Sequence, residues 1–113
     1  MKRILIVDDH EMIRRGIKVL VQKSHVVCGE AADGDEAVAR AQELKPDLIV
    51  LDVSMPRMDG VQAFNRIRAL VPEARIILYT IYPPEALRIS GADAVVSKEA
   101  DSARLLETID RVA

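Results

Sequence analysis

Three acidic residues of this chain follow two apolar runs at the point where each run ends. Asp8 and Asp9 come directly after the run 4–7, and Asp52 comes directly after the run 48–51. Unbroken apolar runs of this length are typical of parallel strands that are buried on both faces. Because ligands of such sheets bind just beyond the carboxyl ends of the strands, we expect the three carboxylates to share one crevice.

A crevice with three carboxylates favours a hard divalent cation. Three like charges repel one another and raise at least one pKa unless a cation offsets them. Magnesium prefers oxygen ligands and retains several waters, so one or two carboxylates and a backbone carbonyl suit it. We expect Asp9, Asp52 and the carbonyl of Ser54 to coordinate the metal directly, with Asp8 acting through water. The predicted cofactor is Mg²⁺.

Two further polar residues end other strand-like runs and extend this chemistry. Thr80 closes the run 76–79, and Lys98 follows the run 94–97. A carboxylate beside magnesium is either a ligand only or a nucleophile that accepts a phosphoryl group. A transferred phosphoryl group carries charge that a lysine neutralises and that a hydroxyl hydrogen-bonds, whereas a pure metal site has little use for a nearby cation. The set indicates phosphoryl transfer to Asp52, assisted by Lys98 and Thr80.

Strand-like runs alternate with helical segments along the whole chain. The runs cover residues 3–8, 26–31, 47–52, 75–80 and 94–98. Between them, apolar residues recur at helical spacing, as in the stripe that includes Met12, Ile13 and Ile17. Such alternation requires crossover connections. It predicts an α/β fold with a doubly wound five-stranded parallel sheet in the flavodoxin-like order 2-1-3-4-5.

Composition limits what else the chain can do. Its 113 residues, half of them apolar, suffice for one domain, which we expect to span residues 1–113. A net charge of −2 and only three aromatic residues provide neither a basic stripe nor a stacking surface for nucleic acid. The N-terminal apolar run is too short for a signal peptide or a membrane span, so a cytoplasmic protein is expected. The single cysteine, Cys28, is interpreted as a packing residue.

Other residues near these motifs have a plain structural interpretation. His10 follows the acidic pair, but a solvated loop histidine is favoured over a ligand because magnesium avoids imidazole. Met55 and Met58 are assigned to packing. Charges of the first helical segment, such as Arg14, are interpreted as a solvated face. His25 begins a strand and has no partner visible in the sequence.

Two motifs carry a resemblance to a known family. Residues 4–9 read ILIVDD, and residues 52–60 read DVSMPRMDG. Together with Thr80 and Lys98, they resemble the receiver domains of bacterial two-component response regulators, and the resemblance covers essentially the whole chain. It implies that Asp52 takes a phosphoryl group from a phosphohistidine on a sensor histidine kinase. It also implies a phosphoacceptor that assists its own phosphorylation and dephosphorylation, and not a turnover enzyme.

The resemblance extends to one subfamily. Residues 8–10 read DDH and residues 29–34 read GEAADG, which is most similar to regulators with a LuxR-type helix-turn-helix effector. Transcription would then be switched through an effector that these 113 residues do not contain, and DNA would be contacted only through it. The sensor kinase and a second copy of the chain are the candidate partners, with no membrane partner. The stop at Ala113 and the subfamily resemblance lead us to expect the front part of a longer regulator.

Two features depart from the family. Only eighteen positions separate Thr80 from Lys98, about one helical turn fewer than usual, so a shortened fourth helix is predicted within 83–90. Val95 stands where the family usually has tyrosine or phenylalanine, which leaves the switch without that ring, and Tyr82 is a substitute. These departures support a second hypothesis, a receiver-like interaction module with an altered or phosphorylation-independent output.

Two other interpretations are weaker. Strands must end in polar residues, so each of these residues alone has a structural explanation, but the five together do not. An aspartate-nucleophile phosphatase is disfavoured because Ser54 stands two residues after the nucleophile, where such enzymes place a catalytic acid.

Overall fold

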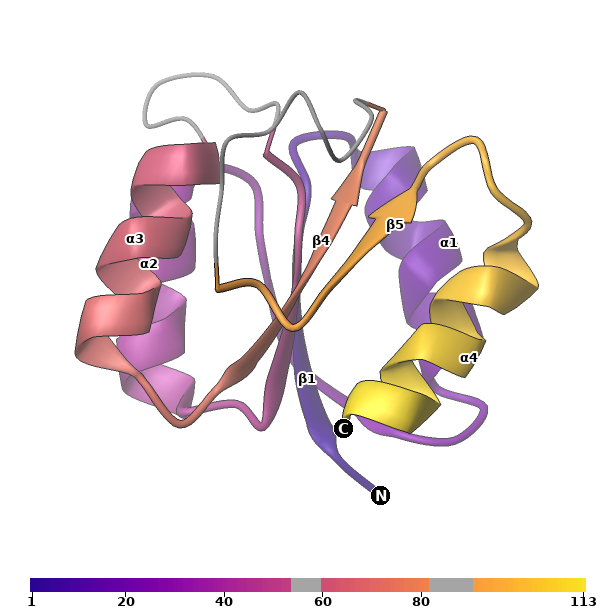
Figure 1. The fold of residues 1–113 in the computed structure, drawn as a ribbon, viewed down its shortest axis with the longest axis horizontal. Coiled ribbons are helices and arrows are strands. Elements are labelled where there is room, and N and C mark those ends of the chain that lie inside the picture. The colour runs from indigo at the N-terminus through magenta and orange to yellow at the C-terminus, as the bar shows by residue number, and fades with distance from the viewer. Residues whose placement is uncertain (54–59, 82–90) are drawn as a thin grey trace.

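A five-stranded parallel sheet forms the centre of the molecule (Figure 1). The computed structural model describes residues 1–53, 60–81 and 91–113. The strands are β1 (Arg3–Val7), β2 (Val26–Ala31), β3 (Leu48–Leu51), β4 (Arg75–Thr80) and β5 (Ala94–Ser97). Their order is β2-β1-β3-β4-β5, and every neighbouring pair is parallel. The predicted α/β class and the predicted order 2-1-3-4-5 are confirmed.

Helices cover both faces of this sheet. α1 (Glu11–Val21) and α4 (Ser102–Val112) lie on one face, whereas α2 (Gly34–Leu44) and α3 (Gly60–Leu70) lie on the other (Figure 1). The short helix predicted within 83–90, and Tyr82 before it, lie outside the described residues. Among the helices of the described ranges, none has the length and apolar character needed to cross a membrane.

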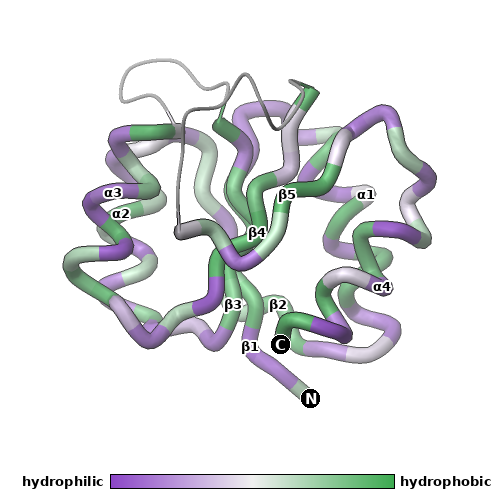
Figure 2. The backbone as a smooth tube through the Cα atoms, in the orientation of Figure 1, coloured by the Kyte–Doolittle hydropathy of each residue, from purple (hydrophilic) through white to green (hydrophobic). Residues whose placement is uncertain are grey.

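The sheet separates two apolar cores. Successive strand residues point to opposite faces, so β1 directs Leu5 and Val7 toward α2 and α3, and Ile4 and Ile6 toward α1 and α4. Figure 2 shows apolar residues gathered along the central strands, whereas apolar and polar residues alternate along the helices. Cys28 packs against the core on the α2 and α3 face, and burial raises the pKa of its thiol, as a packing role requires.

One residue of the predicted α1 stripe lies on the wrong face. Met12 is 75% exposed, whereas Ile17 and Val21 are buried against the sheet. Met12 precedes Ile17 by five positions, which turns it about 140° around the helix axis. The apolar stripe of α1 is therefore narrower than the sequence pattern predicted.

Candidate functional site

The strand ends bring the predicted residues to one edge of the sheet. β1 and β3 are neighbours, so Asp8 and Asp52, which follow them, leave the sheet side by side. The Asp52 amide donates a hydrogen bond to the Val7 carbonyl at 2.9 Å. At the next pair of strands, the Lys98 amide donates to the Thr80 carbonyl at 2.8 Å. Backbone hydrogen bonds thus continue past the ends of the strands and fix the backbone positions of Asp52 and Lys98.

Asp8 and Asp52 are carboxylates of the protein interior, with 0% and 1% of their surface exposed. The Lys98 ammonium lies between them. Its Nζ is 2.6 Å from Asp8 Oδ2 and 3.4 Å from Asp52 Oδ2. Buried charges are tolerated when they are paired and hydrogen-bonded. One cation therefore serves two buried acids.

Lys98 remains charged in this position. Burial by itself lowers the pKa of its ammonium, but the hydrogen bond to Asp8 and the charge of Asp52 outweigh that effect. The net result is a pKa above the ordinary lysine value. A permanent positive charge thus faces the predicted phosphoacceptor.

Four side chains at this edge form a cluster that we call the acidic pocket: Asp8, Asp9, His10 and Asp52. One ligand atom from each lies within 4.8 Å of the others. Asp9 is partly exposed, with 24% of its side chain accessible, so the pocket opens toward solvent there. Within the described residues, three carboxylates outnumber the one ammonium beside them, that of Lys98, and oxygen donors of this kind fit Mg²⁺.

His10 is closer to the carboxylates than the sequence suggested. Its side chain is 63% exposed, as expected for a loop residue. Its Nδ1 nevertheless lies 3.0 Å from Asp9 Oδ1 and 3.3 Å from Asp8 Oδ1. The imidazole therefore contacts the acidic pocket, although magnesium prefers the oxygen donors beside it.

Thr80 is fully buried at the end of β4, the strand next to β3. Its position places it at the same edge of the sheet as Asp52. The remaining predicted groups around the phosphoacceptor, the Ser54 carbonyl and the side chains of Met55 and Met58, lie outside the described residues.

Gly60, the first residue of α3, brings that helix against the chain beside Asp52, the predicted phosphoacceptor. Its amide donates to the Val53 carbonyl at 3.1 Å. A Cβ atom at position 60 would collide with the Val53 backbone. Only glycine allows this approach, which fixes the backbone one residue after Asp52.

Arg14 supports the pocket in a way that the sequence analysis missed. Its Nη1 donates to the Asp8 carbonyl at 2.7 Å, and its Nε donates to Glu30 Oε1 at 3.2 Å. Only 17% of its side chain is exposed, so the prediction of a solvated charge is wrong here. The sequence did contain a signal for this contact: Glu30 lies near the end of the predicted strand 26–31, and Arg14 lies in the first helical segment.

Comparison with known proteins decides the family. A family model described as "Response regulator receiver domain" matches residues 4–110. The chain belongs to the response regulator receiver family. Chemotaxis protein CheY of Thermotoga maritima is 36% identical over 116 residues, which cover 98% of this receiver domain and 97% of that protein.

Longer relatives of this receiver domain are regulators. Response regulator protein VraR of Staphylococcus aureus is 38% identical over 95% of the chain, and the chain spans only 54% of VraR. The crystal structure of a LuxR-family two-component response regulator from Aurantimonas sp. SI85-9A1 superposes with a TM-score of 0.92 at 33% identity. That match covers 99% of this chain and 84% of the other. The predicted resemblance to LuxR-type regulators is confirmed.

Proposed function

We propose that this receiver domain is a phosphorylation-dependent signalling domain with Asp52 as its phosphoacceptor. One observation carries the proposal: the Lys98 ammonium lies 2.6 Å from Asp8 and 3.4 Å from Asp52, in a cluster of acids that outnumber the cations of the described residues beside them. A phosphoryl group on Asp52 would find a preset cation for its oxygens. Thr80 is the proposed hydroxyl donor to the same oxygens.

The proposed reaction needs only positioning and charge compensation from the protein. An Asp52 oxygen attacks the phosphorus of a phosphohistidine, the phosphorus–nitrogen bond breaks, and an acyl phosphate forms. The departing imidazole nitrogen keeps the electron pair and takes a proton from solvent. Lys98 offsets the charge that Asp52 gains. The domain assists its own phosphorylation and dephosphorylation, and is not a turnover enzyme.

Asp9, Asp52 and the Ser54 carbonyl would hold Mg²⁺, with Asp8 acting through water. The bound metal would neutralise phosphoryl oxygens during transfer. The three carboxylates of the acidic pocket support this assignment, because among the described residues they face one ammonium, which leaves negative charge to be balanced.

The proposed phosphoryl donor is a sensor histidine kinase, which implies a cytoplasmic location. The proposed output is transcription, through a LuxR-type helix-turn-helix effector in a longer protein of which residues 1–113 form the receiver domain. Homodimers are the proposed assembly of the activated protein. Similarity to VraR, of which the chain spans 54%, supports the presence of a longer regulator.

Acetyl phosphate with magnesium tests the acceptor directly. Intact mass should show the addition of one phosphoryl group to the wild-type chain and none to Asp52→Asn, whose amide is a poor nucleophile. Asp33→Asn, which changes an acid at the start of α2, is the matched control and should still be labelled. Undiminished labelling of Asp52→Asn would remove Asp52 as the acceptor.

A second function is favoured by one observation, the partly buried Val95, which packs against the core without a ring. It is a receiver-like interaction module whose output does not depend on phosphorylation. Size-exclusion chromatography of the labelled and unlabelled chain separates the two. An unchanged oligomeric state and unchanged partner affinity after complete labelling would favour the module.

A further inference from the structure

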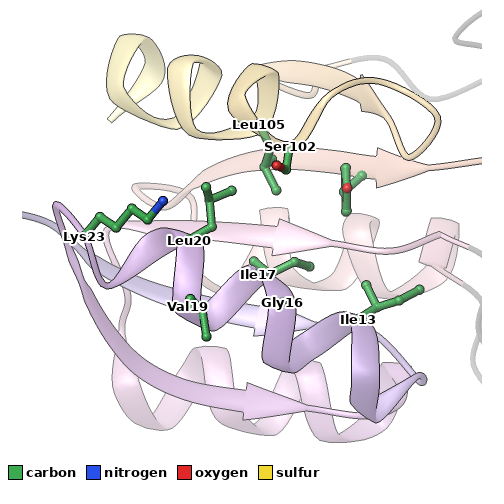
Figure 3. Close-up of a pocket in the computed structure, with 9 residues that line it drawn as sticks. Ile13, Gly16, Ile17, Val19, Leu20, Lys23, Ser102 and Leu105 are labelled. Carbon is green, nitrogen blue, oxygen red and sulfur yellow. The ribbon is translucent and has the colours of Figure 1, made fainter.

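A hollow of about 400 Å³ lies between α1 and α4 on one face of the sheet. Its lining is mostly apolar, and Figure 3 shows Ile17 and Leu20 of α1 facing Leu105 of α4. Gly16 adds no side chain to this wall, and a Cβ built there would meet no atom within 4 Å. The wall therefore leaves room for a neighbouring side chain to change its position.

Tyr79 connects this hollow to the acidic pocket. It lies in β4 opposite Val96, packs against the core on the α1 and α4 face, and contributes to the lining of the hollow. Lys98 Nζ lies 5.8 Å from the centre of the Tyr79 ring. An ammonium at this distance is attracted by the ring face. The cation that pairs with Asp8 and Asp52 therefore also contacts a ring at the edge of the hollow.

A new charge at Asp52 changes the balance between these partners. A phosphoryl group adds anionic oxygens, and charge-assisted hydrogen bonds to such oxygens are stronger than the attraction of a ring. Lys98 would then move toward Asp52 and away from Tyr79. The ring, released from the ammonium and only partly buried, has the hollow beside it in which to take another rotamer.

We propose that Tyr79 relays the phosphorylation state of Asp52 through Lys98 to the hollow between α1 and α4. This inference rests on the proposed function of Asp52. Tyr79 acts as a positioning residue, since it acts on the acceptor only through the Lys98 ammonium. Its ring gives the fold two arrangements, one against the Lys98 ammonium and one turned into the hollow.

Methyl NMR tests the relay, because a moving ring changes the chemical shifts of the methyl groups near it. The chain has only three aromatic residues, so few other rings contribute. Full-length protein is labelled at isoleucine and leucine methyl groups and compared without and with magnesium and beryllofluoride, a stable phosphoryl mimic. The Ile17 and Leu105 methyl signals should shift in the wild type when the mimic binds.

Two variants identify the ring as the cause. Tyr79→Phe keeps the ring and should keep these shifts, whereas Tyr79→Leu keeps apolar volume without a ring and should lose them. Intact mass after acetyl phosphate should show equal labelling of Asp52 in all three proteins. Equal methyl shifts in Tyr79→Leu and wild type, or no shifts in a wild type saturated with the mimic, would overturn the relay.

A further measurement does not depend on the folding of Tyr79→Leu. In wild-type protein, nuclear Overhauser contacts between the Tyr79 ring and the Ile17 and Leu105 methyl groups should strengthen when the mimic binds. Unchanged contacts would also overturn the relay. Failure of Asp52 to be labelled at all would instead overturn the proposed function, so the two failures are distinct.

Discussion

The two ends of β5 carry opposite kinds of charge network. At the carboxyl end, the single ammonium of Lys98 serves the buried carboxylates of Asp8 and Asp52. Just before the amino end, the single carboxylate of Asp93 accepts hydrogen bonds from several donors. Carboxylates outnumber the cation in the first network, and donors outnumber the carboxylate in the second.

The second network, which we call the Asp93 clamp, joins the starts of β4 and β5. Asp93 accepts from the Ile76 amide at 2.7 Å, from Arg68 at 3.1 Å and from Arg75 at 3.3 Å. Arg68 also donates to the Ala74 carbonyl at 2.9 Å. Burial alone would raise the pKa of Asp93, but the hydrogen bonds from Ile76 and Arg68, the charge of Arg68 and the hydrogen bond from Arg75 hold it below its usual value.

The difference shows how the same residue types serve stability or function. In the Asp93 clamp the carboxylate is saturated with donors, so it ties strands together and has little capacity to bind anything else. In the acidic pocket, the carboxylates of the described residues carry more negative charge than the Lys98 ammonium balances. The pocket can therefore bind a metal cation, or a phosphoryl group together with a metal cation. Predictions that change one network and not the other test this contrast.

The largest effect is expected for Lys98→Ala. In buffer without divalent metal, the free energy of unfolding should fall by about 3 kcal/mol, because two buried carboxylates lose their ammonium. Added magnesium should restore part of that loss, since a cation returns to the pocket. Denaturant unfolding with and without magnesium measures both values. A loss that magnesium leaves untouched, or a large fall in magnesium affinity, would contradict the role of Lys98 as a counter-charge.

A smaller loss is expected for Asp93→Asn. The amide keeps one oxygen but turns donor hydrogens toward arginine donors, so the free energy of unfolding should fall by about 2 kcal/mol. Magnesium should not change this loss, in contrast to Lys98→Ala. The exposed Asp35→Asn is the control and should stay within about 0.5 kcal/mol of wild type. An equally small effect at Asp93 would mean that the clamp does not stabilise the fold.

Magnesium should stabilise the domain through Asp9. At ten times its dissociation constant, a ligand that binds only the folded state adds about 1.4 kcal/mol. Calorimetry should therefore show a higher Tm for wild type with magnesium, and a much smaller increase for Asp9→Ala. Equal increases in both proteins would exclude Asp9 from the metal site.

The smallest effect concerns the pH dependence of the Asp93 clamp. The folded pKa of Asp93 lies below its unfolded value, so its contribution is complete above about pH 4 and is lost as the pH falls through the folded pKa. The stability difference between wild type and Asp93→Asn should stay constant at neutral pH and narrow in acid. Urea unfolding over a pH series measures it. A stability difference that widened in acid would contradict a lowered folded pKa of Asp93.

The strands were predictable because their residues are buried on both faces. β1 and β3 contain no polar residue between their first and last buried positions, and a parallel sheet has few other ways to arrange such runs. The edge at which Asp8, Asp52, Thr80 and Lys98 meet followed from the direction of the strands. Helix faces were harder, as Met12 shows, because an error of one position turns a residue about 100° around the helix axis and so changes whether it is buried.

Long-range polar contacts were not predictable from the sequence. His25, for which no partner was visible, places its Nε2 2.7 Å from Asp110 Oδ1 at the end of α4. Arg14 was predicted to face solvent, but its guanidinium donates a hydrogen bond to the Asp8 carbonyl. His25 and Asp110 are 85 positions apart, and Arg14 and its other partner, Glu30, are 16 positions apart, so only the packing of helices on the sheet brings them within reach.

The sequence by itself determined the class of the fold and the set of chemical groups at its active edge, because buried runs and the polar residues that end them are local properties. The tertiary structure decided how those groups share charge. It placed the Lys98 ammonium closer to Asp8 than to Asp52, and also over the ring of Tyr79. Such distances depend on the order and twist of strands and on side-chain rotamers, which no local pattern specifies.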